Sequence, residues 1–345
     1  MAGIPIAVDI MGGDNAPDAI IKGVGDALDV YGDSYQLYLV GDQDRIAAGL
    51  KAIGKDGHSQ LEIVHAPEIV EMGDHPVSSV RSKPRSSINV AVDLVKKKTA
   101  RGIFSAGNTG AAVGSAYLKW HMLPGLERPC IATVIPHATG SFVLLDSGAT
   151  VDCSAQNLAQ FAVMGDIYSR TVLGRKDPSV GLLCNGTEIG KGNHLTVEAF
   201  KLLRDVESLN FIGNVEGHDL FAGRVDVVVC DGFVGNVVLK SCEQMAKCMG
   251  QMLKQQLMKR LLWKVGALFS RGAFQEFKKV LDPSEVGGAP LLGVNGSCII
   301  GHGNSDPRAV CNGIRAVGEL VKHNVNEAIV DQVHQYGLDN LISLN

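Results

Sequence analysis

The feature that most constrains the fold is one local pattern that recurs along the chain: a short β-branched run, a glycine-containing corner and then an amphipathic segment. Strands separated by helices usually pair in parallel, so the pattern predicts a largely parallel sheet covered by helices. The expected strands are residues 4–10, 35–41, 61–66, 102–106, 130–135, 141–146, 179–184, 209–214 and 225–231. Only a few residues separate 130–135 from 141–146, which predicts an antiparallel hairpin and therefore a mixed sheet.

The domain organisation follows from the length of the chain and from the absence of a linker within it. A chain of 345 residues with 46% hydrophobic residues can bury a substantial core. No Ser-, Gly- or Pro-rich linker divides it, so residues 1–345 are expected to form a single three-layer α/β/α domain, with a helical pair protruding at about 235–280. A two-lobed body is the alternative.

Charge and cysteine content exclude several classes of protein. A net charge of −4 argues against nucleic acid as a partner. The eight cysteines contain no CxxC pair and the ten histidines no HExxH, which favours reduced thiols and no metal site. The N-terminus has no basic region, and no stretch of 18 residues is uniformly apolar, so a cytoplasmic location is expected.

Polar, glycine-bearing corners follow five of the expected strands. In open α/β sheets, ligands bind outside the carboxyl ends of the strands, where backbone N–H groups and helix N-termini point outward. If all five corners lie on one sheet edge, they surround one crevice and predict a pocket for a small polar ligand. The corners are residues 12–15, 105–110, 146–148, 185–188 and 231–236.

The corner from Gly107 to Gly110 is the best candidate for an anion site, because it follows a strand and opens the helix GAAVGSAYLKW. Its glycines permit close backbone approach, and Asn108 and Thr109 can donate where the helix dipole is positive. The alternative is an ordinary N-cap.

Two other stretches place positive charge in expected loops. The irregular stretch 67–87 contains Lys83 and Arg85 and is either an anion-binding loop or a solvated surface loop. The stretch NGTEIGKG at 185–192 lacks the spacing of a Walker loop, which leaves Lys191 as a lone cation or a solvated lysine. No strand leads into a dinucleotide fingerprint.

The stretch GHGNSDP at 301–307 places His302 and Asn304 ahead of a long final helix. It is interpreted either as a helix cap or as another wall of the crevice.

A basic, apolar stretch lies between Glu243 and Glu276, where the chain has no acidic residue. It is typical of an interfacial membrane anchor, with Trp at headgroup depth and cations meeting anionic lipid. Packing on another subunit and docking of an acidic carrier protein are the alternatives. The contact residues would be Lys254, Lys259, Arg260, Leu261, Leu262, Trp263, Lys264, Leu268 and Phe269.

The ordered set AVDIMGGDNAP, SAGNTGA, NGTEIGKG, DGFVGNV and GHGNS resembles the phosphate acyltransferases of bacterial phospholipid synthesis, the PlsX family, over essentially the whole chain. The resemblance implies that inorganic phosphate attacks the thioester of acyl-[acyl carrier protein] to give acyl phosphate, with no cofactor. It also implies a homodimer with a Rossmann-like fold similar to phosphotransacetylases and isopropylmalate dehydrogenases. It further implies loose association with the inner face of the membrane, where a downstream membrane acyltransferase uses the product.

The residues of the corners can be assigned hypothetical roles in that reaction. Asn108 and Thr109, with the backbone of Gly107 and Gly110, would hold phosphate or the oxyanion. Positive charge would come from Lys191, with Lys83 or Arg85. The remaining wall would comprise Gly12, Gly13, Asn185, Asp231, Asn236, His302 and Asn304, while Asp14 and Asn15 brace neighbouring loops.

Three other functions compete with this one. A phosphotransacetylase-like enzyme using coenzyme A thioesters would need the same crevice. A nicotinamide-dependent dehydrogenase on this type of fold, or a non-catalytic membrane scaffold, fits the polar corners less well.

Overall fold

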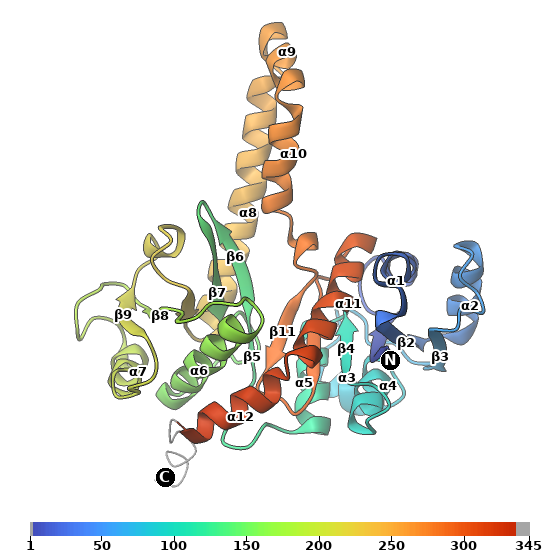
Figure 1. Cartoon of the computed structure of the whole chain (residues 1–345), viewed down its shortest axis with the longest axis horizontal. Coiled ribbons are helices and arrows are strands. Elements are labelled where there is room, and N and C mark those ends of the chain that lie inside the picture. Colours follow the sequence, from blue (N-terminus) through green and yellow to red (C-terminus); the bar gives the residue numbers. More distant parts are fainter. Residues whose placement is uncertain (1–2, 336–345) are drawn as a thin grey trace.

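The strands form two sheets in the computed structural model, which describes residues 3–335. The larger sheet has the order β3 (Leu61–His65), β2 (Tyr35–Gly41), β1 (Ile4–Asp9), β4 (Gly102–Ser105), β12 (Ser297–Ile300), β11 (Ala289–Leu292) and β5 (Cys130–Ile131). The smaller sheet has the order β6 (Thr133–His137), β7 (Gly140–Leu145), β10 (Val227–Val229), β8 (Val180–Leu183) and β9 (Phe211–Val215). The two sheets lie in opposite halves of the body (Figure 1).

Most strand pairs are parallel, and the exceptions are local. β11 runs antiparallel to β12 and β5, and β6 runs antiparallel to β7. The expected mixed, mainly parallel α/β fold and the expected hairpin are therefore confirmed. The expectation of a single sheet is wrong, because the chain leaves one sheet after Ile131 and enters the other at Thr133. β11 and β12 were not anticipated.

Helices cover both faces of the larger sheet, which lies as the middle layer of three. α1 (Asp18–Tyr31) and α11 (Pro307–Lys322) pack on one face, with α2 (Gln43–Ala52) beside them. The other face is covered by α4 (Ser87–Lys96) and α5 (Thr109–Trp120), with α3 (Pro76–Ser82) against α5. Phe104, fully buried in β4, lies in the core beneath α11.

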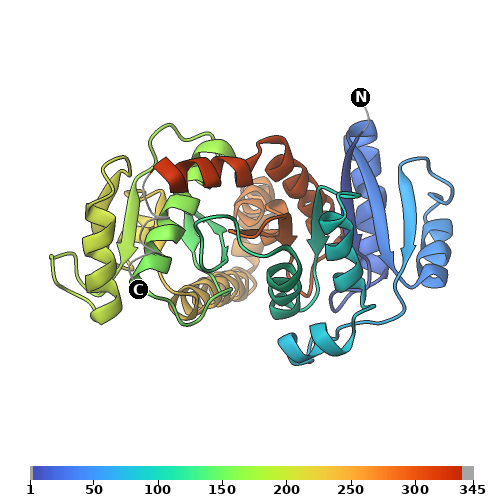
Figure 2. The ribbon, with the colours of Figure 1, turned by 90° about the horizontal axis from the view of Figure 1, so that it is seen from below.

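The smaller sheet is covered by α6 (Ala155–Thr171) and α7 (His194–Arg204) on one face. α12 (Val325–Gln335) lies along α6, so the end of the described chain ties the two halves together (Figure 2). One continuous hydrophobic cluster includes residues from both sheets, from Ile6 of β1 to Val229 of β10. The two sheets thus share one core.

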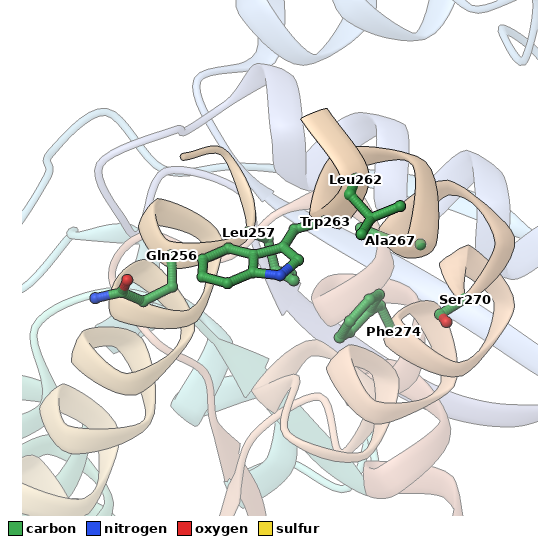
Figure 3. A pocket seen from close by; sticks show the side chains of 8 residues that line it. Gln256, Leu257, Leu262, Trp263, Ala267, Ser270 and Phe274 are labelled. Atoms are coloured by element: carbon green, nitrogen blue, oxygen red, sulfur yellow. The ribbon is translucent and has the colours of Figure 1, made fainter. Parts of the chain in front are cut away.

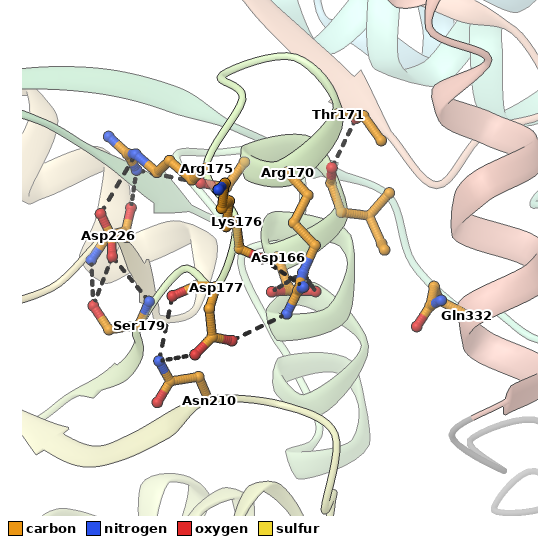
Figure 4. A network of polar contacts seen from close by, with 12 residues as sticks. Asp166, Arg170, Thr171, Arg175, Lys176, Asp177, Ser179, Asn210, Asp226 and Gln332 are labelled. Carbon is orange, nitrogen blue, oxygen red and sulfur yellow. Dashed lines mark hydrogen bonds and ion pairs between the residues drawn. The ribbon is translucent and has the colours of Figure 1, made fainter.

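A polar network fixes the edge of the smaller sheet opposite its carboxyl ends (Figure 4). The fully buried Asp166 of α6 pairs with Arg170, whose guanidinium also reaches Asp177 at 3.4 Å. Arg175 pairs with Asp226 at 3.4 Å, and Asp226 accepts from the Ser179 hydroxyl at 2.9 Å. Burial raises the pKa of Asp166, and the Arg170 hydrogen bond opposes that rise. This network joins α6 to the starts of β8 and β10.

Three helices project from the body: α8 (Gly232–Leu257), α9 (Leu261–Phe269) and α10 (Arg271–Val280). α8 and α10 run side by side away from the sheets, with α9 at the far end (Figure 1). Three short 3-10 helices complete the described elements, at Gly32–Ser34, Asp219–Phe221 and Pro283–Glu285. Within residues 3–335, no helix combines the length and apolar character needed to span a bilayer.

Candidate functional site

The carboxyl ends of three parallel strands meet at the centre of the larger sheet. Asp9 of β1 and Ile300 of β12 each lie in register with Ser105 of β4. The corners that follow these strands, residues 12–15, 105–110 and 301–305, are therefore neighbours although they are far apart in the sequence.

Backbone contacts tie these three corners together. A Cβ added to Gly12 would lie 2.8 Å from the Gly107 nitrogen, so only glycine permits this approach. Asp14 N–H donates to the Gly303 carbonyl at 2.7 Å, and the Asn15 amide donates to the Asn304 carbonyl at 3.2 Å. Asn15 thus braces a neighbouring loop. Asp14 and Asn15 are exposed and line a hollow of about 450 Å³ together with Asp18 and Asp306. Asn304 is also exposed.

A buried carboxylate that sequence reasoning missed lies beneath these corners. Asp9 is 2% exposed and accepts from the Ser105 hydroxyl at 2.8 Å and from the Met11 N–H at 3.3 Å. Burial raises its pKa, and hydrogen bonds from Ser87 and Ser105 oppose the rise. The available signal was a charged residue closing an apolar strand, where a buried carboxylate needs partners.

The N-terminus of α5 carries the predicted anion site, and the structure shows how Asn108 is used there. Its Oδ1 accepts from the Ala111 N–H at 3.0 Å, which is N-cap geometry. Its Nδ2 donates to the carbonyls of Met72 and Asp74, both at 3.1 Å. The alternative of a cap is therefore realised, and the amide also holds residues 71–74 in place.

The donors left at this corner are backbone groups. The Gly107 N–H already donates to the Ser105 hydroxyl at 3.2 Å. For the N–H groups of residues 108, 109 and 110, the described part of the chain supplies no acceptor. Thr109 is exposed, and Pro76 lies against Gly110, where an added Cβ would be 2.6 Å from its ring. Three adjacent N–H groups at a helix N-terminus can bind an anion.

The loop that contains Lys83 and Arg85 is braced internally. Lys83 Nζ lies 2.6 Å from Asp74 Oδ2 and donates to the Ile69 carbonyl at 2.8 Å, so in this conformation its charge is used within the loop. The Lys83 hydrogen bond lowers the pKa of Asp74. Arg85 donates its backbone N–H to Glu68, and its side chain is exposed. Of these two cations, Arg85 is the one available to a ligand.

The other three corners follow strands of the smaller sheet. Leu145 of β7 and Leu182 of β8 are both in register with Val229 of β10, so residues 146–148, 185–188 and 231–236 share this second edge. The five corners are thus divided between two sheets, because β7, β8 and β10 do not join the larger sheet. The expectation that all five lie on one sheet edge is corrected accordingly.

Asp146 organises this second group, and sequence reasoning assigned it no role. It is fully buried, and its carboxylate accepts from the N–H groups of Ile131, Gly148, Ala149 and Thr150 at 2.6–3.0 Å. Burial raises its pKa, and these hydrogen bonds oppose the rise. Because Ile131 belongs to β5, the carboxylate also anchors this corner to the larger sheet.

The predicted wall residues of the second group lie around this anchor. Asp231 caps α8 by accepting from the Val234 N–H at 2.9 Å, and the backbone of Gly235 touches the Asp146 carbonyl. Asn236 is exposed and faces Gly148, with 3.7 Å between its Cβ and a Cβ added there.

Asn185 and Lys191 belong to an exposed turn at the end of β8. The Lys191 N–H donates to the Glu188 carbonyl at 3.1 Å, and the Asn214 amide donates to the same carbonyl at 3.2 Å. Within residues 3–335, neither predicted side chain forms a hydrogen bond or an ion pair with another predicted corner.

A polar contact between His302 and Glu243 joins the corners of the larger sheet to those of the smaller sheet. His302, which follows β12, places Nε2 at 3.1 Å from Glu243 Oε1 of α8, and Lys240 Nζ lies 3.0 Å from Glu243 Oε2. The His302 hydrogen bond lowers the pKa of Glu243 to about 2. Glu243 was not among the predicted site residues, because its partner comes from a distant corner.

The chemistry available at these corners is anion binding and polar positioning. Three backbone N–H groups, the Thr109 hydroxyl, Arg85 and His302 are donors or cations near the strand ends. Among residues 3–335, no cluster of three His, Cys, Asp or Glu has an arrangement suited to a metal ion.

Comparisons with known proteins agree over nearly the full chain. A family profile described as "Fatty acid synthesis protein" matches residues 4–328. A curated protein of Acidobacterium capsulatum named phosphate acyltransferase is 49% identical over 324 residues, 94% of this chain and 95% of that protein. One of Pelobacter propionicus with the same name is 45% identical over 336 residues, 97% of this chain and 96% of that protein.

Solved structures share the fold at low sequence identity. A phosphotransacetylase from Streptococcus pyogenes has a TM-score of 0.61 at 15% identity, covering 93% of this chain and 94% of that one. A 4-hydroxythreonine-4-phosphate dehydrogenase from Klebsiella pneumoniae has a TM-score of 0.52 at 12% identity, covering 93% and 98%. The likeness to a phosphotransacetylase and to a dehydrogenase confirms the expected α/β fold class.

Proposed function

We propose that the chain transfers the acyl group of acyl-[acyl carrier protein] to inorganic phosphate, because it belongs to the fatty acid synthesis protein family of phosphate acyltransferases. The product would be an acyl phosphate, formed in the first step of glycerophospholipid synthesis. The single observation that supports the reaction class is 45–49% sequence identity to curated phosphate acyltransferases over at least 94% of the chain. Which thioester donates the acyl group is a separate part of the proposal.

The reaction suits a site made of backbone donors. Phosphate is a competent oxygen nucleophile and a thiolate is a reasonable leaving group, so the enzyme must mainly position the reactants and stabilise the tetrahedral oxyanion. The N–H groups of residues 108–110 and the Thr109 hydroxyl would bind phosphate or this oxyanion. The required chemistry involves no organic cofactor.

The remaining predicted residues would act around this centre. Arg85 would supply charge once the 71–76 segment admits phosphate, and Lys191 would supply charge from the second edge. Asn185, Asn236 and Asn304 are exposed amides at the strand ends and would hydrogen-bond the thioester arm. Lys83, Asp14, Asn15 and Asp231 would act indirectly, since the first three brace loops and Asp231 caps α8.

A donor assay tests the proposal. The protein is incubated with ³²P-labelled phosphate and palmitoyl-[acyl carrier protein], or with palmitoyl-coenzyme A at the same concentration. Labelled acyl phosphate from the carrier-protein thioester, at a kcat/KM at least about tenfold above that of the coenzyme A thioester, is the expected result. Preference for coenzyme A would establish the phosphotransacetylase-like alternative, and no labelled product from either donor would reject acyl transfer to phosphate.

We further propose that the far end of the projecting helices binds an anionic membrane surface. We call it the basic tip, residues 254–269. Its Leu261 and Phe269 are 79% and 86% exposed, and the Arg260 guanidinium lies 4.6 Å from the centre of the Trp263 ring. Leu257, Trp263 and Phe274 surround an apolar hollow of about 440 Å³ (Figure 3). Exposed apolar side chains among cations favour an interface with anionic lipid.

This placement would make the protein a cytoplasmic enzyme bound peripherally to the inner face of the membrane. There it could deliver acyl phosphate to a downstream membrane acyltransferase. Docking of the acidic carrier protein at the basic tip is the alternative, since cations serve either partner.

A homodimer is the last part of the proposal. Met245, Met249 and Met252 of α8 are each more than half exposed at helical spacing, which is typical of a packing stripe. Light scattering at micromolar concentration should give twice the chain mass of 36.5 kDa, and polar substitutions along the stripe should halve it. A monomeric wild type would reject the dimer.

A further inference from the structure

Glu243 lies where the two groups of corners meet. Its side chain is 16% exposed, and it reaches the imidazole of His302 from α8, a helix that begins at the end of β10. His302 belongs to the corner after β12, which also contacts Asp14 through Gly303. A carboxylate from the smaller sheet's side thus holds an imidazole of the larger sheet's edge.

The hydrogen bond defines which nitrogen of the neutral ring carries the proton. An ionised carboxylate can only accept, so Nε2 must be the donor to Glu243. Nδ1 then bears the lone pair, and no residue between 3 and 335 supplies a partner for it. The pKa of Glu243, held at about 2 by His302 and Lys240, keeps the carboxylate ionised at neutral pH.

We propose that Glu243 is a positioning residue for His302 in the acyl transfer described above, on which this inference rests. With Nε2 engaged, Nδ1 of the neutral ring takes the proton of HPO₄²⁻ as a phosphate oxygen bonds to the thioester carbonyl carbon. The tetrahedral intermediate then collapses, the C–S bond breaks, and Nδ1 returns that proton to the departing sulfur. The products are acyl phosphate and a free thiol, and the imidazole ends neutral as it began.

Replacing His302 and replacing Glu243 should lower the rate by different amounts. General acid–base catalysis contributes about 10²- to 10⁴-fold in rate, which His302→Gln should lose. Glu243→Gln keeps the size of the side chain but can donate as well as accept, so the ring is no longer held in one tautomer. We expect kcat to fall by at least about tenfold, with KM for phosphate and thioester changed by less than about threefold.

Two further variants separate positioning from simple structural support. Glu243→Asp keeps an exclusive acceptor and should recover part of the kcat lost in Glu243→Gln. The double variant Glu243→Gln with His302→Gln should be no slower than His302→Gln alone, because the two residues act as one unit. Glu62→Gln, the same change at an exposed position of β3, is the matched control and should keep the wild-type kcat.

The outcomes are distinguishable from failure of the reaction itself. If the wild type forms no acyl phosphate from either thioester, the proposed function fails and this role of Glu243 fails with it. If the wild type is active, the inference is overturned by a kcat within about twofold of wild type in Glu243→Gln, by an effect confined to KM, or by losses that multiply in the double variant. Thermal melting of each variant ensures that folded proteins are compared.

Discussion

The backbone N–H of Asp14 donates to the carbonyl oxygen of Gly303 over 2.7 Å, joining the first corner of the chain to the corner after β12. Gly13, immediately before this donor, has φ +110°, and a Cβ added there would lie 2.9 Å from the same carbonyl oxygen. An L-residue at Gly13 is therefore both strained and crowded.

We expect Gly13→Ala to weaken phosphate use as well as stability. The added methyl must displace the 301–305 corner or the Ala106 carbonyl, which lies 3.0 Å from it and precedes the N–H groups proposed to bind phosphate. The KM for phosphate in the labelled-phosphate assay should rise, and the free energy of unfolding in urea should fall by more than the 1–2 kcal/mol or so that a left-handed L-residue costs alone.

The control for backbone strain is Gly57→Ala. Gly57 has φ +70° with no atom within 4 Å of an added Cβ, so this variant carries strain without crowding. It should lose stability and keep its phosphate KM. An unchanged phosphate KM in Gly13→Ala would make the corner purely architectural.

The side chain of Asn108 has two separable functions, and Asn108→Asp should remove only one of them. A carboxylate keeps the acceptor for the Ala111 N–H and suits a helix N-terminus, but it cannot donate to the carbonyls of residues 71–74. The 71–76 segment should then open more often, which limited proteolysis after Glu71 by a glutamate-specific protease would detect as faster cleavage.

Asn108→Ala removes both functions, so it should show the same faster cleavage and also lose about 0.5–2 kcal/mol of stability with the cap. Equal cleavage rates in wild type and Asn108→Asp would show that the amide does not hold the segment. If Asn108 also donates to the oxyanion during turnover, kcat falls by about 10²- to 10³-fold in Asn108→Ala, which adds no negative charge to the phosphate site. An unchanged kcat would leave oxyanion binding to the backbone N–H groups.

The corners show which features of the fold can be predicted from the sequence. Glycine pairs after apolar runs identify the turns at residues 12–13 and 107–110, because both the conformation and its cause are local. The partition into two sheets is different. Residues 130–135 have the pattern of one continuous strand, yet Ala132 N–H donates to the Pro290 carbonyl, and the chain changes sheet within that run. Contacts from a strand more than a hundred residues away decide the change.

The same distinction applies to individual site residues. Asp9, Asp146 and Glu243 stand in the sequence as ordinary acidic residues, and their importance comes from Ser105, Ile131 and His302, which lie in other elements. For Lys83 the sequence suggested a role that the structure does not support. A cation in a loop predicted an anion site, but Lys83 pairs with Asp74 of the same loop. β12 was missed because its four residues follow β11 through a short glycine-containing turn with no clear alternation.

The ionisation of Asp9 should make stability depend on pH. Burial raises its pKa in the folded state above the ordinary value of 3.8, so the folded protein holds this proton after the unfolded chain has released it. This contribution to stability is present at low pH and is lost as pH rises from about 3.8 through the folded-state value. Asp9→Asn cannot ionise, and its Oδ1 still accepts from Met11.

The free energy of unfolding of both proteins, measured in urea from pH 4.5 to 7.5, checks this sign. The difference, Asp9→Asn minus wild type, should grow more positive as pH rises. Asp146 and Asp166 also have raised pKa values, but they are common to both proteins and cancel in the difference. Parallel curves would mean that Asp9 has the same pKa in both states.

The basic tip should lose its membrane affinity when its exposed apolar side chains are replaced. Leu261, Trp263 and Phe269 would each bury apolar area in the interface, worth about 1.5–3 kcal/mol per fully buried side chain, so a triple change to Ser should reduce vesicle binding by more than about 100-fold. Co-sedimentation with phosphatidylcholine vesicles containing 25% phosphatidylglycerol measures it. Activity on soluble acyl-[acyl carrier protein] should remain, because α8 separates the basic tip from the strand ends (Figure 1).

Val30→Ser with Ile212→Ser, two exposed apolar positions on the body, is the matched control and should bind vesicles as the wild type does. If the triple variant still sediments with vesicles, the anchor lies elsewhere. If it binds vesicles normally but its KM for the carrier-protein thioester rises, the basic tip docks the carrier protein instead.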